Sequence, residues 1–405
     1  METGTRRSKW RERLHAGRAR RRLARMGLNA RSIETFLKDA VEVDLHAKTV
    51  LSLSMGTVGV LHALSLCIHV IGRALAWAHG GDPKHAIKQV DRLLSNAKVS
   101  IEGLARPWAG FLIGERKEIL VALDWTDFDA DDHTTLCAYL VTRHGRATPL
   151  LWETAEKSTL KRKRNAFETK FLERLREAIP TDVQVTILAD RGFGDQKRYE
   201  QLRSIGFHYV IRFRQGIKVA DQFGEQKTAR EWLLPSGRAR LLKEMAVTDD
   251  LYIVPAVVLV WDKRMKEPWC IATDRADLTA AEVTKLYGRR FTIEETFRDA
   301  KDIHFGLGLS ATHIGDAGRR DRLLLLAAIA HVLLTLLGAA GERAGLDRTL
   351  KANTVKKRTL SLYNQGFYWY MAIPNMREDR LVLLMKAYAE VIHEQAFLRD
   401  LLGTI

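Results

Sequence analysis

The hydrophobic pattern of the chain changes near residue 115. Before that point apolar residues recur at helical spacing, most clearly in Ile87, Val90 and Leu94. This run follows the sequence Gly80-Gly-Asp-Pro83, which is typical of a break between helices. After residue 115 the apolar positions form short runs separated by turn residues, which is the pattern of strands. We therefore expect a helical N-terminal region followed by a mixed α/β region.

Two of the short runs predict buried strands that end at an aspartate. Residues 118–124 form a short run that is apolar between Glu118 and Asp124, and residues 183–189 are followed directly by Asp190. Continuous apolar runs of this length are typical of strands covered on both faces. Ligands of open α/β sheets collect at the carboxyl ends of such strands. Asp124 and Asp190 are therefore candidate functional residues.

The elements around these two runs complete an alternating pattern. Residues 136–142 and 147–152 flank a turn and predict a hairpin. Residues 157–179 and 196–205 predict helices, and residues 208–213 predict another strand. The order strand, hairpin, helix, strand, helix, strand favours an α/β sheet.

The region 217–275 has a different character from its surroundings. Three strand-like runs occur there without an intervening helical pattern, at residues 239–244, 251–261 and 268–273. Trp261 and Trp269 fall within these runs. The pattern predicts a β-rich insertion.

The stretch from Tyr287 to Lys301 predicts a single helix that displays one chemically active stripe. It contains no proline, and Gly288 is its only strong helix breaker. At about 100° per residue, Arg290 and Glu294 share a narrow stripe with the two end residues. Arginine and lysine bind phosphate, and glutamate is a hard oxygen ligand for metal ions. The alternative interpretation is a surface helix with ordinary Glu–Lys pairs.

Composition favours a polyanionic partner. The chain of 405 residues has 65 Lys and Arg against 49 Asp and Glu, a formal charge of +16. Residues 1–31 alone hold eleven Lys or Arg and two Glu, which suits phosphate neutralisation by a basic arm or a solvated tail. The three cysteines show no disulfide or zinc spacing, so we expect a reducing, cytoplasmic location.

Two uncharged stretches raise the question of a membrane. Residues 50–72 and 323–340 are long enough to span a bilayer. The first contains histidines, serines and glycines, and the second contains His331. We expect both to be buried helices of a protein that does not enter the membrane.

The stripe resembles a motif of known enzymes. Tyr287, Arg290, Glu294 and Lys301 match the Tyr-x2-Arg-x3-Glu-x6-Lys signature of bacterial insertion-sequence transposases of the DDE class, the insertion-sequence-four type family. The resemblance covers roughly residues 80–370. It implies a ribonuclease-H-like catalytic core interrupted by a β-rich insertion domain, with helical N-terminal and C-terminal regions.

The resemblance and the strand ends together define a carboxylate set. We expect Asp124, Asp190 and Glu294 to be catalytic and to hold two Mg²⁺ ions, for which Mn²⁺ would substitute. Such a pair of ions stabilises the attacking and leaving oxygens of a phosphodiester. Asp127 and Asp195 are the rivals, but they do not directly terminate apolar runs.

The family also implies DNA-binding roles. Arg290 and Lys301 would hold phosphates of the terminal DNA, and Tyr287 would position the strand. Trp269 begins a Trp-x3-Thr run that ends at Thr273, where the family uses the indole to hold a flipped base. A core position for Trp269 is the alternative, because large aromatic residues often anchor sheets.

These expectations combine into one hypothesis. The chain would bind the ends of its insertion sequence, cleave them with metal-dependent hydrolysis and join the 3′-hydroxyl to target DNA, as a homodimer without a nucleotide cofactor. A structure-specific nuclease and a non-catalytic DNA-binding derivative are the alternatives. The expected regions are a basic arm (1–31), a helical DNA-binding domain (32–112), the core (113–216 and 276–345), the β-rich insertion (217–275) and a helical C-terminal region (346–405).

Overall fold

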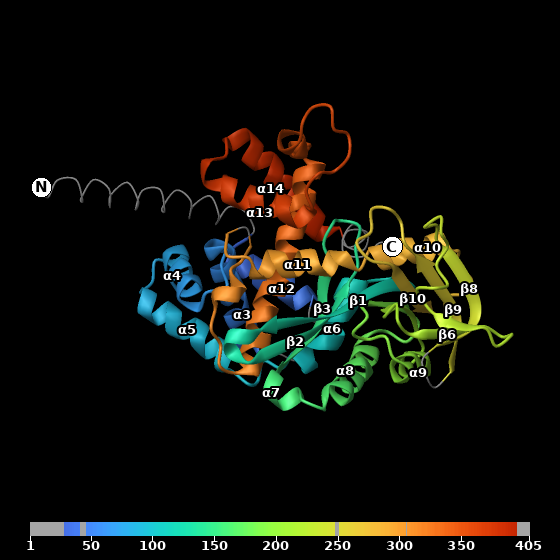
Figure 1. The fold of residues 1–405 in the computed structure, drawn as a ribbon. Coiled ribbons are helices and arrows are strands. Elements are labelled where there is room, and N and C mark those ends of the chain that lie inside the picture. The colour runs from blue at the N-terminus through green and yellow to red at the C-terminus, as the bar shows by residue number, and fades with distance from the viewer. Residues whose placement is uncertain (1–27, 41–45, 248–250, 305, 395–405) are drawn as a thin grey trace, which may run out of the picture.

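The computed structural model describes residues 28–40, 46–247, 251–304 and 306–394 (Figure 1). A mixed α/β arrangement is present, with helices before and after a central sheet. The α/β prediction and the helical N-terminal and C-terminal regions are therefore confirmed. Most of the predicted basic arm lies outside the described residues.

Helices before the sheet form a compact group. They are α2 (Ala30–Ala40), α3 (Ala47–Ala63), α4 (Ile68–His79), α5 (Pro83–Ser95) and α6 (Ile101–Ile113). The predicted break between α4 and α5 is confirmed: Gly80 ends α4 in the left-handed region at φ 69°. The Asp82 carboxylate then accepts hydrogen bonds from the backbone N–H of Lys84 and His85, which caps α5.

Ten strands within the described residues form one sheet, in the order β3-β2-β1-β4-β5-β10-β9-β8-β6-β7. In chain order they are β1 (Glu118–Phe128), β2 (His133–Leu140), β3 (Thr148–Glu156), β4 (Gln184–Ala189), β5 (Phe207–Phe213), β6 (Lys218–Ala220), β7 (Gln226–Thr228), β8 (Arg240–Val247), β9 (Tyr252–Val260) and β10 (Trp269–Thr273). The pairs β1–β4 and β4–β5 are parallel, and the hairpin strands β2 and β3 add antiparallel at one side.

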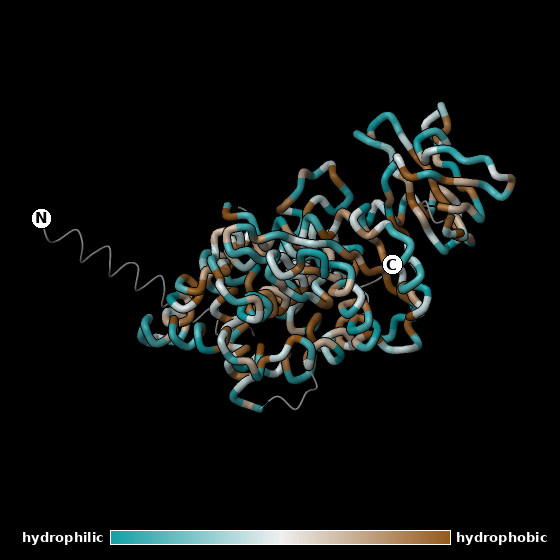
Figure 2. Tube along the Cα trace, turned by 60° about the horizontal axis from the view of Figure 1, so that its bottom comes forward, coloured by the Kyte–Doolittle hydropathy of each residue, from teal (hydrophilic) through white to brown (hydrophobic). Residues whose placement is uncertain are grey.

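The region 217–275 continues this sheet. Strand β10 pairs antiparallel with β5 and with β9, so the strands of this region extend the sheet outward from β5. Figure 2 shows hydrophobic residues along the strands of this outer part and hydrophilic residues in the loops around it.

Strand β1 is longer than the sequence pattern predicts. The apolar run ends at Asp124, but the strand continues to Phe128 because its far half pairs with β2, from Asp124 opposite Cys137 to Phe128 opposite His133. The expectation that β1 ends at Asp124 was therefore wrong. The pairing partner, not the local apolar run, sets the length.

The helices that follow the sheet strands are α7 (Lys157–Leu160), α8 (Arg164–Ala178), α9 (Gln196–Ser204), α10 (Ala280–Gly288), α11 (Phe291–Lys301), α12 (Ala317–Arg343), α13 (Leu362–Ala372) and α14 (Glu378–His393). Short 3₁₀ turns are η1 (Asp129–Asp131), η2 (Leu309–Ala311), η3 (Leu346–Leu350) and η4 (Ile373–Asn375). The single helix predicted for 157–179 is wrong, because Arg162 has a positive φ of 66° and separates α7 from α8.

The single helix predicted from Tyr287 to Lys301 is also wrong. Helix α10 ends at Gly288 and α11 begins at Phe291. The intervening backbone makes tighter bonds, from the N–H of Arg290 to the carbonyl of Tyr287, three residues back. Gly288, a poor helix former, lies at this junction. Arg289 and Arg290, which lie between the two helices, both keep helical dihedral angles, so the backbone stays in the helical region across the break.

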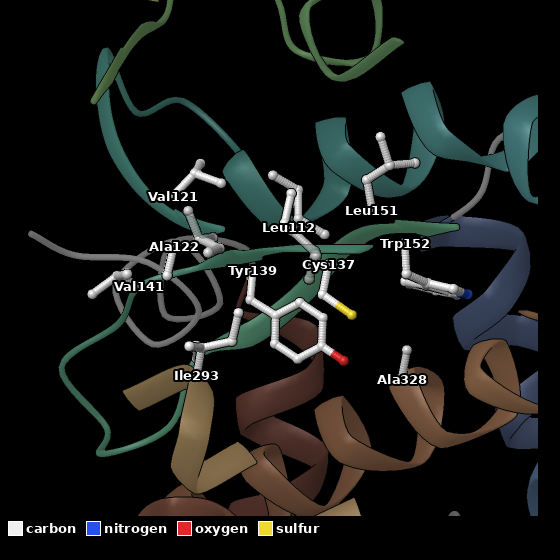
Figure 3. Close-up of a cluster of buried hydrophobic side chains, with 14 of the residues drawn as sticks. Leu112, Val121, Ala122, Cys137, Tyr139, Val141, Leu151, Trp152, Ile293 and Ala328 are labelled. Atoms are coloured by element: carbon white, nitrogen blue, oxygen red, sulfur yellow. The ribbon is translucent and has the colours of Figure 1, made fainter. Parts of the chain in front are cut away.

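Helices cover both faces of the sheet. Figure 1 shows α8 and α9 on one face and α10 and α11 on the other. Figure 3 shows the core around the hairpin strands: Leu112 of α6 lies above them, and Tyr139 of β2 points down between Ile293 of α11 and Ala328 of α12. The sheet segment that carries the aspartates is therefore buried from both sides.

Helix α12 is long and apolar enough to cross a membrane by length and composition, and its apolar window is wholly buried within the protein. It packs on α13 so closely that the two backbones touch near Gly338 and Gly366. The stretch around α3 and α4 is bent by 99° between the two helices. Burial of residues 323–340 in a helix is as the sequence predicts.

Candidate active site

The parallel pairing of β1 and β4 brings the two candidate aspartates together. Leu123 lies opposite Ala189 in the register, so Asp124 and Asp190 are the next residues on neighbouring strands. The Asp190 carboxylate accepts a hydrogen bond of 2.8 Å from the backbone N–H of Gly192, which closes a tight turn after β4. Two residues that are distant in sequence thus lie side by side on the sheet, just past the last paired residues of β1 and β4.

Arg290 connects this place to the glutamate helix. Its guanidinium donates to the Asp124 carboxylate at 3.1 Å and to the Glu294 carboxylate at 2.6 Å. The arginine side chain is only 7% exposed, so it is enclosed between the two acids. Asp124, Glu294 and Arg290 therefore meet in one site, with a cation lying between two carboxylates.

Burial destabilises the charged form of Asp124. Burial is the main cause that raises its pKa to about 6, and the carboxylates of Asp190 and Glu294 raise the pKa further. Arg290 and the backbone N–H of Trp125 act in the opposite direction. The charged form of Asp124 is therefore destabilised even with Arg290 beside it, and another cation would stabilise it.

The acids are not assembled as a ready ligand set. Among the described residues, no group of three or more His, Cys, Asp or Glu side chains is positioned to hold a metal ion. The guanidinium of Arg290 lies where Asp124 and Glu294 face each other. The donors themselves are hard oxygens, which suit Mg²⁺ and Mn²⁺. The residues therefore fit a divalent ion in chemistry, and Arg290 must move for Asp124 and Glu294 to share one.

An aromatic cluster borders the site. The ring of Trp269 at the start of β10 packs edge-on against Tyr287 at 4.8 Å and lies 5.8 Å from Phe291. Tyr287 is buried, and burial raises the pKa of its hydroxyl. The guanidinium of Arg290 lies over the ring of Phe291 at 4.8 Å. Trp269 is half-buried, so it is neither a pure core residue nor a free surface ring.

Lys301 lies at the other end of α11, away from the arginine bridge. Its ammonium donates a hydrogen bond of 2.6 Å to the backbone carbonyl of Asp127 and lies 4.5 Å from the ring centre of Phe128. Burial lowers the pKa of this lysine, and Asp127 opposes that change. Of the four signature residues, the structure places Tyr287, Arg290 and Glu294 near one another, with Lys301 beside the far half of β1.

A known family matches the region of the chain that carries these residues. Residues 115–333, more than half of the chain, match the family described as the transposase DDE domain. The chain belongs to this family. The family implies DNA transposition activity, with DNA as the substrate, and a catalytic transposase. A search of curated proteins finds no match to the chain.

The rival aspartates of this transposase have other partners. The Asp127 carboxylate accepts a hydrogen bond of 2.6 Å from the Thr134 hydroxyl and pairs with the Lys157 ammonium at 3.1 Å. The Asp195 carboxylate accepts from the backbone N–H of Arg198 and so caps α9. Both rivals have structural roles, whereas Asp124 and Asp190 face the arginine bridge and the Gly192 turn.

Sequence reasoning missed the anchor that holds α11 against the hairpin. The Arg146 guanidinium pairs with the buried Asp299 of α11, and the Thr296 hydroxyl donates to the backbone carbonyl of Ala147 at 2.9 Å. The backbone N–H of Ala147 in turn donates to the Thr296 hydroxyl at 3.0 Å. The signal in the sequence was an arginine in the predicted turn and an aspartate on the inner side of the helix, but their pairing needs the tertiary fold.

Proposed function

We propose that this transposase binds the ends of its insertion sequence, cleaves them by metal-dependent hydrolysis and joins the freed 3′-hydroxyl to target DNA. The observation that carries the proposal is the bridge from Arg290 to Asp124 and Glu294, with Asp190 on the neighbouring strand. These residues come from three distant parts of the chain. The match to the transposase DDE domain supports the same reaction.

The strand order supports a ribonuclease-H-like core. We assign that core to the five strands β3-β2-β1-β4-β5, in which β1, β4 and β5 are parallel and the hairpin lies outside β1. Strands β6 to β9 then form the β-rich insertion, which returns through β10 to the glutamate helix. The four signature residues from Tyr287 to Lys301 support the insertion-sequence-four type within the family.

Asp124, Asp190 and Glu294 would hold two divalent cations, Mg²⁺ or Mn²⁺. When bound, the ions would stabilise the attacking and leaving oxygens of the phosphodiester. The raised pKa of Asp124 supports this assignment, because burial destabilises the charged carboxylate and a bound cation would stabilise it. The protein contributes the oxygen donors and a rigid sheet that fixes two of them.

Arg290 and Lys301 would bind DNA phosphates. A guanidinium released from Asp124 and Glu294 presents a planar fork that matches a phosphate. Tyr287 would hold the aromatic cluster in place, and Trp269 would stack on a base of the terminal DNA. Trp269 packs against Tyr287 and is only half-buried, so part of its ring stays accessible to a base.

The remaining assignments follow the expected regions. The helices α2 to α6 would bind DNA with the basic arm, and the C-terminal helices would contribute to a homodimer in the DNA complex. A cytoplasmic location suits a protein that acts on chromosomal DNA. The DNA-binding role of α5 is supported by two exposed lysines on this helix, Lys84 and Lys88. The positive net charge of the chain supports it as well.

A strand-transfer assay tests the proposal. Purified protein, Mg²⁺ and duplexes copied from the DNA flanking the gene should give cleavage at one junction and joined products with a target plasmid. Scrambled duplexes serve as the control. Cleavage of both duplexes without joining would instead identify a structure-specific nuclease, and binding without cleavage would identify a non-catalytic derivative.

A further inference from the structure

The turn between β2 and β3 carries two arginines with opposite surroundings. Arg146 is neutralised, because its guanidinium pairs with Asp299 and lies 3.7 Å from the Glu295 carboxylate. Arg143 is exposed, and within the described residues its guanidinium forms no ion pair or hydrogen bond. Within the described residues, the turn thus carries one arginine that is paired with acids and one that has no acidic partner.

Arg289, at the junction of α10 and α11, is a second arginine without an acidic partner in the described part of the chain. It is half-buried, and its side chain has no acidic partner among the described residues. Burial lowers the pKa of Arg289, and the nearby charge of Arg143 lowers it further. The two positive charges therefore lie close enough to repel each other, and neither side chain has an acidic partner among the described residues.

Backbone contacts fix this meeting of two segments. The backbone N–H of Ala147 donates to the carbonyl of Thr292 at 3.3 Å, which joins the hairpin turn to the first turn of α11. The ion pair of Arg146 with Asp299 holds the same two segments together one turn further on. The proximity of Arg143 and Arg289 is therefore set by the fold and not by two flexible side chains alone.

A third segment adds two more cations. The Arg358 guanidinium donates to the backbone carbonyl of Arg143 at 3.4 Å, and the backbone N–H of Leu362 donates to the carbonyl of His144. Arg358 is itself paired with Glu342. Lys356 and Lys357, which immediately precede it, are exposed and have no acidic partner within the described chain. The segment before α13 therefore extends the basic surface.

We propose that Arg143 and Arg289 form a phosphate-binding clamp for duplex DNA, extended by Lys356 and Lys357. A phosphate between the two guanidinium groups replaces their repulsion with two charge-assisted hydrogen bonds. Arg289 directly precedes Arg290, and consecutive Cα atoms are about 3.8 Å apart. Through Arg289 the clamp adjoins the N-terminal end of α11, the helix that carries Glu294. This inference rests on the proposed function.

The test compares charge removal at the clamp with charge removal elsewhere. The variants are Arg143→Gln with Arg289→Gln, the corresponding double lysine variant, and Arg203→Gln as the control. Arg203 is exposed on α9, which lies on the other face of the sheet (Figure 1). The readouts are the affinity for an end duplex at several salt concentrations, cleavage by the same protein, and the thermal unfolding midpoint without DNA.

The double glutamine variant should lower the slope of log affinity against log salt by about two. Affinity at 0.1 M salt should fall on the order of tenfold for each arginine. The double lysine variant should keep most of the slope, and Arg203→Gln should keep all of it. Without DNA, the unfolding midpoint of the glutamine variant should equal or exceed that of the unmodified protein at low salt, because a like-charge contact is removed.

Three results would overturn the clamp. An unchanged salt slope in a double variant of a protein that cleaves DNA would remove Arg143 and Arg289 from the DNA while leaving the proposed function intact. A lowered unfolding midpoint with an unchanged slope would show that the pair is structural. If the unmodified protein itself neither binds nor cleaves the duplex, the proposed function fails and the clamp fails with it, which is a distinguishable outcome.

Discussion

Arg290 donates to Asp124 at 3.1 Å across 166 positions of sequence, and so joins the start of the glutamate helix to the middle of β1. The same guanidinium donates to Glu294, one turn along α11. A monovalent side-chain cation thus occupies the space between two acids of the proposed catalytic set. Under the proposed function, a divalent ion shared by Asp124 and Glu294 would therefore require the release of Arg290.

Replacing Arg290 with alanine should strengthen the binding of divalent ions in the absence of DNA. The substitution removes the cation that neutralises Asp124 and Glu294, so Mn²⁺ affinity should rise on the order of tenfold. Mn²⁺ titration followed by electron paramagnetic resonance measures this directly. Arg290→Lys keeps the charge and should behave like the unmodified protein. An unchanged or weaker affinity in the alanine variant would show that Arg290 does not compete with the ion.

The raised pKa of Asp124 predicts a pH-dependent gain in stability for Asp124→Asn. The folded protein holds the Asp124 proton up to about pH 6, whereas the unfolded chain releases it near the ordinary value of 3.8. The stability from this site is fully present below pH 3.8 and is lost as pH rises through 6. The neutral asparagine avoids this loss, so its free energy of unfolding should exceed that of the unmodified protein at pH 8 by up to about 3 kcal/mol.

Urea unfolding at pH 8 and pH 5 measures the effect. The difference between the two proteins should shrink as pH falls toward 5. A variant that is less stable at both values would show that the charged form of Asp124 stabilises the fold, contrary to the burial argument.

Backbone contact between α12 and α13 predicts a strong effect of one methyl group. A Cβ added at Gly338 would lie 1.9 Å from the carbonyl oxygen of Leu362, so the helices would have to separate. Gly338→Ala should therefore lower the free energy of unfolding by about 1–3 kcal/mol or more. Gly110→Ala is the matched control, because nothing lies within 4 Å of its added Cβ in α6. The control should be neutral or stabilising by up to about 1 kcal/mol.

Denaturant midpoints of the two glycine variants give the comparison. Equal midpoints would mean that α12 does not pack on α13 in this way, and would reopen the question of where this long apolar helix lies.

The hydrophobic and polar pattern of the sequence was enough to predict the parts of the site that lie within a single helix or strand. The helical period placed Arg290 and Glu294 on one side, and the apolar run before Asp190 marked the end of β4. The length of β1 could not be read in this way, because its extension past Asp124 depends on pairing with β2. The break after Gly288 was also missed, since a lone glycine is tolerated in many helices.

Contacts between distant segments were beyond the sequence pattern. Arg146 could be seen in a turn, but its pairing with Asp299 depends on how α11 crosses the hairpin. The meeting of Arg143 with Arg289 depends on the same crossing. The bridge from Arg290 to Asp124 likewise needed the fold, because helix periodicity says nothing about which strand a side chain faces.

The central claim is that Asp190 belongs to a carboxylate set that cleaves DNA. Mg²⁺-dependent cleavage of an end duplex by Asp190→Asn tests it most directly, with Asp195→Asn as the matched control and a gel shift to measure binding. Asparagine caps helices as well as aspartate does, so the control should keep α9 and its activity. We predict that Asp190→Asn loses cleavage while its DNA affinity stays within a few-fold of the unmodified protein. A fully active Asp190→Asn protein would contradict the assignment.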